Sequence, residues 1–89
     1  TLVDDGEIYI GDYTMIGPNV NIVTAGHPIL PELREEVYQF NIPVHIGRNA
    51  WIGAGVTILP GVTIGEGGVI GAGSVVAENI QANSLVPAG

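Results

Sequence analysis

The feature that most constrains this chain is an aliphatic residue that returns at every sixth position. A first run comprises Ile10, Ile16 and Ile22. Glycine follows most of the repeated residues, and a small or β-branched residue often stands two positions before them. The second run keeps the same spacing without a break and consists of Ile46, Ile52, Ile58, Ile64, Ile70 and Val76. Nine such hexads in 89 residues indicate an internal structural repeat.

Each hexad is predicted to form a short strand followed by a corner. Glycine, asparagine and proline supply the backbone conformations that turns require, and β-branched residues favour strands. A period of six with 14 glycines does not match the 3.6-residue stripe of a helix. We therefore predict an all-β solenoid in which one aliphatic side chain per hexad points inward and successive coils pair as parallel strands, about 4.8 Å apart.

The repeat is interrupted once, over residues 25–41, which we expect to form an extruded loop. This segment holds two prolines, the only phenylalanine and a charged cluster. Long loops on rigid scaffolds often carry function, although a tolerated insertion is the alternative. His27 stands at the mouth of the loop and is a candidate general base, because imidazole titrates near neutral pH. His45 alternates with Val44 and Ile46, which predicts an outward, surface position.

Composition excludes several classes of function. The net charge is −7, lysine is absent and arginine occurs twice, which argues against a nucleic acid or an anionic membrane surface as partner. The absence of cysteine excludes disulfides, thiolate zinc sites and a cysteine nucleophile. Two histidines are too few for a three-histidine zinc hydratase, so we expect no metal. No signal peptide or long apolar run occurs, which is compatible with a cytoplasmic protein.

Two segments give the chain a family resemblance that covers essentially all of its residues. The strings NIVTAGHPILPELR and NIPVHIGRNAWIGAGVTILPGVTIGEGGVIGAGSVV resemble the maltose and galactoside O-acetyltransferases, which are hexapeptide-repeat acyltransferases. The resemblance implies a left-handed parallel β-helix with three hexads in each triangular coil. The left hand comes from the resemblance alone, because general connection rules favour a right-handed crossover.

The resemblance also implies roles for individual residues in transfer of an acetyl group from acetyl-CoA to a sugar hydroxyl. His27 corresponds to the general base of the family, and the absence of cysteine agrees with direct transfer. Asp5 and Gln39 correspond to residues of the acceptor site. The remaining correspondences concern the cofactor: Ala54 next to the thioester, Ala72 and Ala77 along the pantetheine and nucleotide, and Trp51 as a wall of the site or a subunit contact.

Three further expectations follow from the resemblance. Residues 1–89 form a single β-helix domain, a fragment that lacks an N-terminal helical segment and the C-terminal end of its relatives. The active form is a homotrimer with each active site between two subunits, His27 coming from one and the Trp51–Ala54 region from its neighbour. Glu78 stands where many relatives have a lysine, and a carboxylate there repels the anionic cofactor. A polysaccharide or non-sugar acceptor, and a non-catalytic solenoid, stay open as alternatives.

Overall fold

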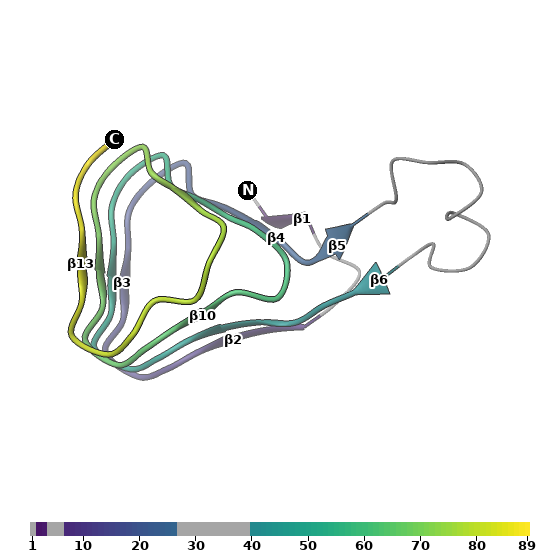
Figure 1. Ribbon diagram of the computed structural model, residues 1–89, viewed down its shortest axis with the longest axis horizontal. Coiled ribbons are helices and arrows are strands. Elements are labelled where there is room, and N and C mark those ends of the chain that lie inside the picture. Colours follow the sequence, from purple (N-terminus) through teal and green to yellow (C-terminus); the bar gives the residue numbers. More distant parts are fainter. Residues whose placement is uncertain (1, 4–6, 27–39) are drawn as a thin grey trace.

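The computed structural model describes residues 2–3, 7–26 and 40–89, and within these ranges every helix or strand assigned is a β-strand. The strands form three parallel sheets, which are the sides of a triangular prism (Figure 1). Sheet A contains, in order, β1 (Leu2–Val3), β4 (Asn21–Val23), β9 (Thr57–Ile58) and β12 (Val75–Val76). Sheet B contains β10 (Thr63–Ile64), β7 (Val44–Ile46) and β2 (Ile8–Ile10). Sheet C contains β13 (Leu85–Val86), β11 (Val69–Ile70), β8 (Trp51–Ile52) and β3 (Met15–Ile16).

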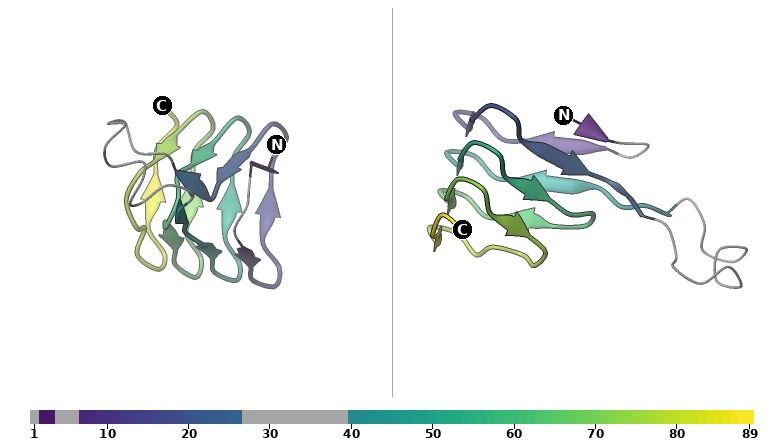
Figure 2. Two further views of the ribbon diagram at one scale, coloured as in Figure 1. Left: turned by 90° about the vertical axis from the view of Figure 1, so that its right-hand side faces the viewer. Right: turned by 90° about the horizontal axis from the view of Figure 1, so that it is seen from above.

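From β1 to β4 and again from β7 to β12, consecutive strands lie in successive sheets, so the chain turns a corner after each one. In Figure 1 it runs along sheet B, then C, then A, and winds clockwise as it comes toward the viewer, which is a left-handed path. Figure 2 shows the coils stacked along one axis, from the N-terminal purple coil to the C-terminal yellow one. The predicted left-handed parallel β-helix is confirmed.

The strand register reproduces three hexads per coil and shows one departure. Ile46 pairs with Ile64 and Ile52 with Ile70, a register of 18 residues. In the last coil Ile64 bridges to Ile80, which is a step of only 16 residues. The corner after β12 is therefore two residues shorter than a hexad allows, and the solenoid continues beyond the point where the sequence repeat ends.

The inward ladder of aliphatic residues forms the core of the prism. Each inward side chain stacks on its equivalent one coil away, so burial is nearly complete in the middle coils. The buried apolar residues are Val20, Ile22, Val44, Ile46, Ala50, Ile52, Val56, Ile58, Val62, Ile64, Ile70 and Val76. Ile10 and Ile16 belong to the same ladder but are 47% and 39% exposed, because β2 and β3 are edge strands of their sheets.

The corners depend on residues that tolerate a left-handed backbone. Among the described residues, the non-glycine positions with positive φ are three asparagines and one tyrosine, Tyr13 at 62°. Asparagine and glycine adopt this conformation readily, whereas a bulky side chain rarely does. The asparagine and glycine positions are Asn19, Asn49, Asn83, Gly55, Gly61, Gly67 and Gly73.

The interruption of the repeat leaves the prism at the corner between sheets A and B. β5 (Ala25–Gly26) and β6 (Phe40–Asn41) pair in antiparallel fashion there, with Ala25 opposite Asn41. The backbone N–H of Ile42 donates to the carbonyl of Thr24 at 2.8 Å and joins this pair to the coil. The base of the predicted loop thus has the expected position, and Figure 1 shows it on the side of the prism away from sheet C.

Candidate functional site

Three of the predicted site residues, His27, Asp5 and Gln39, lie outside the described residues. The described strands that flank residues 27–39 in the sequence are β5 and β6, at the loop base. His27 follows Gly26 directly, and Gly26 pairs with Phe40 on the returning strand. The loop therefore starts and ends at one corner of the prism, on the side away from sheet C (Figure 1).

Trp51 lies on the outer face of sheet C, within a row of apolar side chains. The register sets Met15 beside Trp51, Trp51 beside Val69 and Val69 beside Leu85. Met15, Trp51 and Leu85 are 62%, 59% and 70% exposed. We call these four residues the sheet C row. In a single chain the loop base and Trp51 are on opposite sides of the prism, so the structure does not bring Trp51 to the mouth of the loop.

Ala54 and Ala72 share the corner between sheets C and A, one coil apart. Both residues are exposed, and both have small side chains. The N–H groups of Gly53 and Gly55 donate to Ile70 and Pro18 at 2.8 and 3.0 Å. The N–H of Ala54, between them, makes no hydrogen bond to any described residue. A free amide at this position is a donor for a carbonyl oxygen of a ligand.

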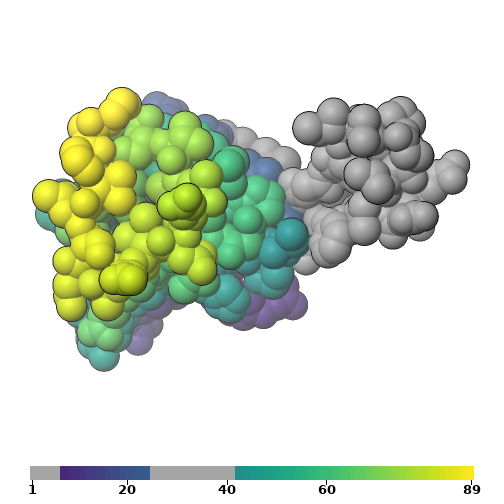
Figure 3. All heavy atoms as spheres, viewed as in Figure 1, coloured from purple at the N-terminus to yellow at the C-terminus, as the bar shows by residue number. Residues whose placement is uncertain are grey.

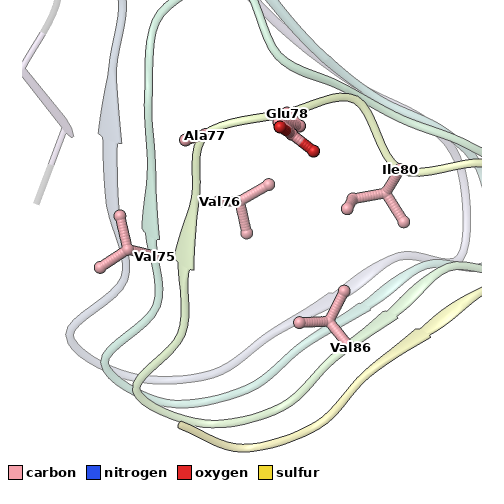
Figure 4. Close-up of a pocket in the computed structure, with 6 residues that line it drawn as sticks. All are labelled: Val75, Val76, Ala77, Glu78, Ile80 and Val86. Carbon is pink, nitrogen blue, oxygen red and sulfur yellow. The ribbon is translucent and has the colours of Figure 1, made fainter.

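Ala77 lies apart from these two alanines, at the corner that follows β12. It lines a pocket of about 260 Å³ in the last coil. Figure 4 shows Val76, Ile80 and Val86 pointing into the centre of this coil, Val75 pointing away, and Glu78 next to Ala77 on the rim. The last coil, yellow and yellow-green, faces the viewer in Figure 3. The pocket is thus the C-terminal end of the ladder, with one carboxylate beside it.

The structure adds two contacts that sequence analysis did not predict. His45 is exposed as expected, and its ring stacks on that of Tyr9 with centroids 4.7 Å apart and planes 8° from parallel. The guanidinium carbon of Arg48 lies 6.0 Å from the centre of the Tyr13 ring. Both contacts join residues of neighbouring coils across the interruption. The 36-residue register between Ile10 and Ile46 is the signal that aligns them.

Two negative findings apply to the described ranges alone. No three residues among His, Cys, Asp and Glu gather closely enough there to hold a metal ion. The same ranges contain no helix with the length and hydropathy needed to span a membrane.

The sequence of this chain is similar to a protein family and to several curated proteins. Residues 43–78 match the family described as bacterial transferase hexapeptide (six repeats). A galactoside O-acetyltransferase from Lactococcus lactis is 54% identical over 59 residues, which are 66% of this chain and 28% of that protein. A putative acetyltransferase of Schizosaccharomyces pombe is 51% identical over 85 residues, which are 96% of this chain and 41% of that protein. The chain thus spans less than half the length of the curated relatives it matches.

Two solved structures share the fold over nearly all of the chain. A galactoside acetyltransferase in complex with coenzyme A superposes with a TM-score of 0.87 at 48% identity, covering 96% of this chain and 42% of that one. A maltose O-acetyltransferase from Clostridium difficile 630 superposes with a TM-score of 0.81 at 54% identity, covering 88% and 42%. The coils described above are therefore a shared structural unit of these proteins.

Proposed function

Because the chain belongs to the hexapeptide-repeat transferases, we propose that this protein transfers the acetyl group of acetyl-CoA to a hydroxyl group of a sugar. The observation that carries the proposal is the likeness to the galactoside acetyltransferase in complex with coenzyme A, at 48% identity over 96% of the chain. The maltose O-acetyltransferase at 54% identity supports the same class of acceptor.

His27 is the general base of the proposed reaction. Its imidazole takes the proton of the sugar hydroxyl while the hydroxyl oxygen attacks the thioester carbonyl. The carbon–sulfur bond then breaks, the acetyl ester forms, and the imidazolium returns the proton to the departing coenzyme A thiolate. The chain contains no cysteine, which agrees with direct transfer rather than a cysteine-bound acetyl intermediate.

Ala54 supplies a backbone donor to the same reaction. Its N–H is free within the described residues and binds the thioester oxygen as negative charge develops there. Ala72, one coil further on, lies along the pantetheine arm, and Ala77 lies toward the nucleotide. Asp5 and Gln39 contact the hydroxyl groups of the acceptor, for which carboxylate and amide oxygens are suitable acceptors of hydrogen bonds.

The complete site forms between two copies of the chain, within a homotrimer. The loop that carries His27 starts at the corner between sheets A and B, whereas Trp51 is on sheet C. One copy therefore cannot bring the loop base to Trp51, but the loop corner of one copy can face sheet C of the next. The exposed sheet C row is a suitable surface for this contact because it is apolar and carries no charge. The protein is proposed to act in the cytoplasm, where acetyl-CoA is available.

The test is acetyl transfer to a panel of galactosides, maltose and glucose by the natural full-length protein. His27→Ala is expected to lower kcat by about 10²–10⁴-fold, as removal of a general base does. His45→Ala is the matched control, since it removes the other histidine of the sequence from an exposed face and leaves kcat within about threefold. Full activity of His27→Ala excludes the assigned role. No transfer to any hydroxyl acceptor by the unmodified protein favours a non-catalytic solenoid.

A further inference from the structure

The two halves of the proposed site lie at the two corners that bound sheet A. Ala54 is at the corner between β8 of sheet C and β9 of sheet A. The loop base is at the corner between β4 of sheet A and β7 of sheet B. Sheet A is therefore the side of the prism that joins these corners, whereas the third corner, between sheets B and C, holds neither half of the site (Figure 1).

A closed ring of copies determines which side of each prism faces the axis. The same contact joins the Ala54 corner of one copy to the loop corner of the next, all the way round. Each copy sees its two neighbours at an angle smaller than a straight line, and the axis lies inside that angle. The shorter path between the two corners runs along sheet A, so sheet A faces the axis. A contact of sheet C with the opposite corner alone forms a straight row that does not close.

The distribution of charge agrees with this orientation. Asp12, Arg48 and Glu66 gather at the corner between sheets B and C, which is opposite sheet A, and the two remaining described carboxylates, Glu7 and Glu78, belong to the loop corner. Among the described residues, no charged side chain lies on the outer face of sheet A or at its corner with sheet C. A threefold axis brings identical residues together, so a charge on sheet A is repelled by its own copies, whereas a charged corner suits the solvent side.

The outer face of sheet A carries a row of uncharged side chains along the axis of the solenoid. The register sets Asn21 beside Thr57 and Thr57 beside Val75. We call these three residues the sheet A row. Asn21 and Thr57 are half-buried, and Val75 is 67% exposed and points away from the centre of its coil (Figure 4). Packing against two other copies covers Val75 and removes its apolar surface from water.

We propose that the sheet A rows of three copies face one another around the threefold axis of the homotrimer. The partner of this face is thus sheet A of two further copies of the same chain. The orientation brings the Ala54 corner of one copy to the loop corner of the next and leaves the outer face of sheet B to solvent. This inference rests on the proposed function, because the roles given to Ala54 and to the loop of His27 define the two corners.

The first test is the oligomeric state of variants of the natural full-length protein. Val75→Glu places three carboxylates near the axis, and the dissociation constant of the trimer is expected to rise about 100-fold or more. Thr57 and Thr63 are a matched pair, since each is the middle residue of a Val-Thr-Ile segment, one on sheet A and one on sheet B. Thr57→Glu is expected to weaken the trimer, and Thr63→Glu to leave the constant within about a factor of three. Sedimentation velocity over a concentration series measures these changes. The inference is overturned if Thr63→Glu dissociates the trimer and Val75→Glu does not.

Cross-linking tests the same arrangement without an added charge. The 89 residues contain no cysteine, so one introduced thiol reports on one position once any cysteine elsewhere in the full-length protein is replaced by serine. A short bismaleimide is expected to link two copies of Val75→Cys and not two copies of Thr63→Cys. Linkage of Thr63→Cys alone overturns the inference, and a monomeric unmodified protein overturns it together with the proposed homotrimer. A trimer that is linked through Val75→Cys but transfers no acetyl group supports the inference and contradicts the proposed function.

Discussion

A methyl group added to Gly53 would lie 2.7 Å from the backbone nitrogen of Ala72 on the next coil. Two more atoms of that coil lie at 3.0 Å from the same point, and all three belong to the backbone. The corner of one coil therefore rests directly on the corner of the next, and the close approach sets the spacing along the edge that carries Ala54 and Ala72.

Gly53→Ala is expected to lower the free energy of unfolding by about 1–3 kcal/mol, because the backbone of the next coil must shift to admit the methyl group. Gly55→Asn is the matched control. Its φ of +71° suits asparagine, and the nearest atoms to an added Cβ are 4.0 Å away. Stability within about 0.5 kcal/mol of the unmodified protein is expected for this variant in urea denaturation. Equal stability of both variants contradicts the close-contact interpretation.

The ladder of isoleucines predicts a graded response to truncation. Ile52 is fully buried, so Ile52→Ala removes its packing and leaves a cavity, at a cost of about 2–5 kcal/mol. Ile10 belongs to the same ladder but is 47% exposed, and Ile10→Ala is expected to cost about 1–2 kcal/mol. The comparison is made by urea denaturation at one protein concentration. Equal losses at the two positions indicate that the end of the ladder is covered in solution.

The sequence predicts the inward ladder because one aliphatic residue per hexad is enough to define a coil of 18 residues. It does not predict the last coil, because Ile80 comes four residues after Val76 and falls outside the hexad spacing. The pairing of Val86 with Ile70 on β11 shows that packing against the previous coil, and not the repeat itself, determines that path.

Less of the candidate site than of the fold could be predicted from the sequence. The stack of Tyr9 on His45 and the contact of Arg48 with Tyr13 join residues on either side of the interruption. They become visible only when the register across it is known. The opposite positions of Trp51 and the loop base likewise depend on which sheet follows the interruption, and residue types alone do not indicate this.

Trp51→Ala tests whether the sheet C row is a contact between copies of the chain. Trp51 is the largest side chain of that row and is 59% exposed in a single copy. Loss of a tryptophan at the centre of an interface typically costs at least 2 kcal/mol, so the dissociation constant of the trimer is expected to rise about 30-fold or more. Sedimentation velocity over a concentration series measures this change. Thr63→Ala on sheet B is the control, and an unchanged size distribution for both variants rules out the row as the contact.

Ser74→Ala tests the one buried serine hydroxyl of the described core. Ser74 is 7% exposed, and its Oγ lies 2.8 Å from the carbonyl oxygen of Gly71 and 3.0 Å from that of Pro87. Removal of the hydroxyl leaves these two carbonyls with one fewer donor, and the expected loss is about 1 kcal/mol. Ser84, which directly precedes β13 on sheet C, is half-buried, and Ser84→Ala is expected to cost less. A larger loss for Ser84→Ala in thermal unfolding contradicts the role given to the contact with Pro87.

The positive φ of Tyr13 leads to opposite stability predictions for two substitutions, one at Tyr13 and one at Asn49, the equivalent residue on the next coil. Tyr13→Asn places a residue that tolerates positive φ where the tyrosine now lies, which relieves about 1 kcal/mol of backbone strain. The variant also loses the contact with Arg48, worth about 0.5–1 kcal/mol at an exposed site. The net stability is therefore expected to stay level or to rise by up to about 0.5 kcal/mol. Asn49→Tyr introduces the same strain one coil on without a guanidinium contact, and a loss of about 1–2 kcal/mol is expected in chemical denaturation. If Tyr13→Asn is instead less stable by more than about 1 kcal/mol, the Tyr13 ring contributes more to folding than its contact with Arg48 accounts for.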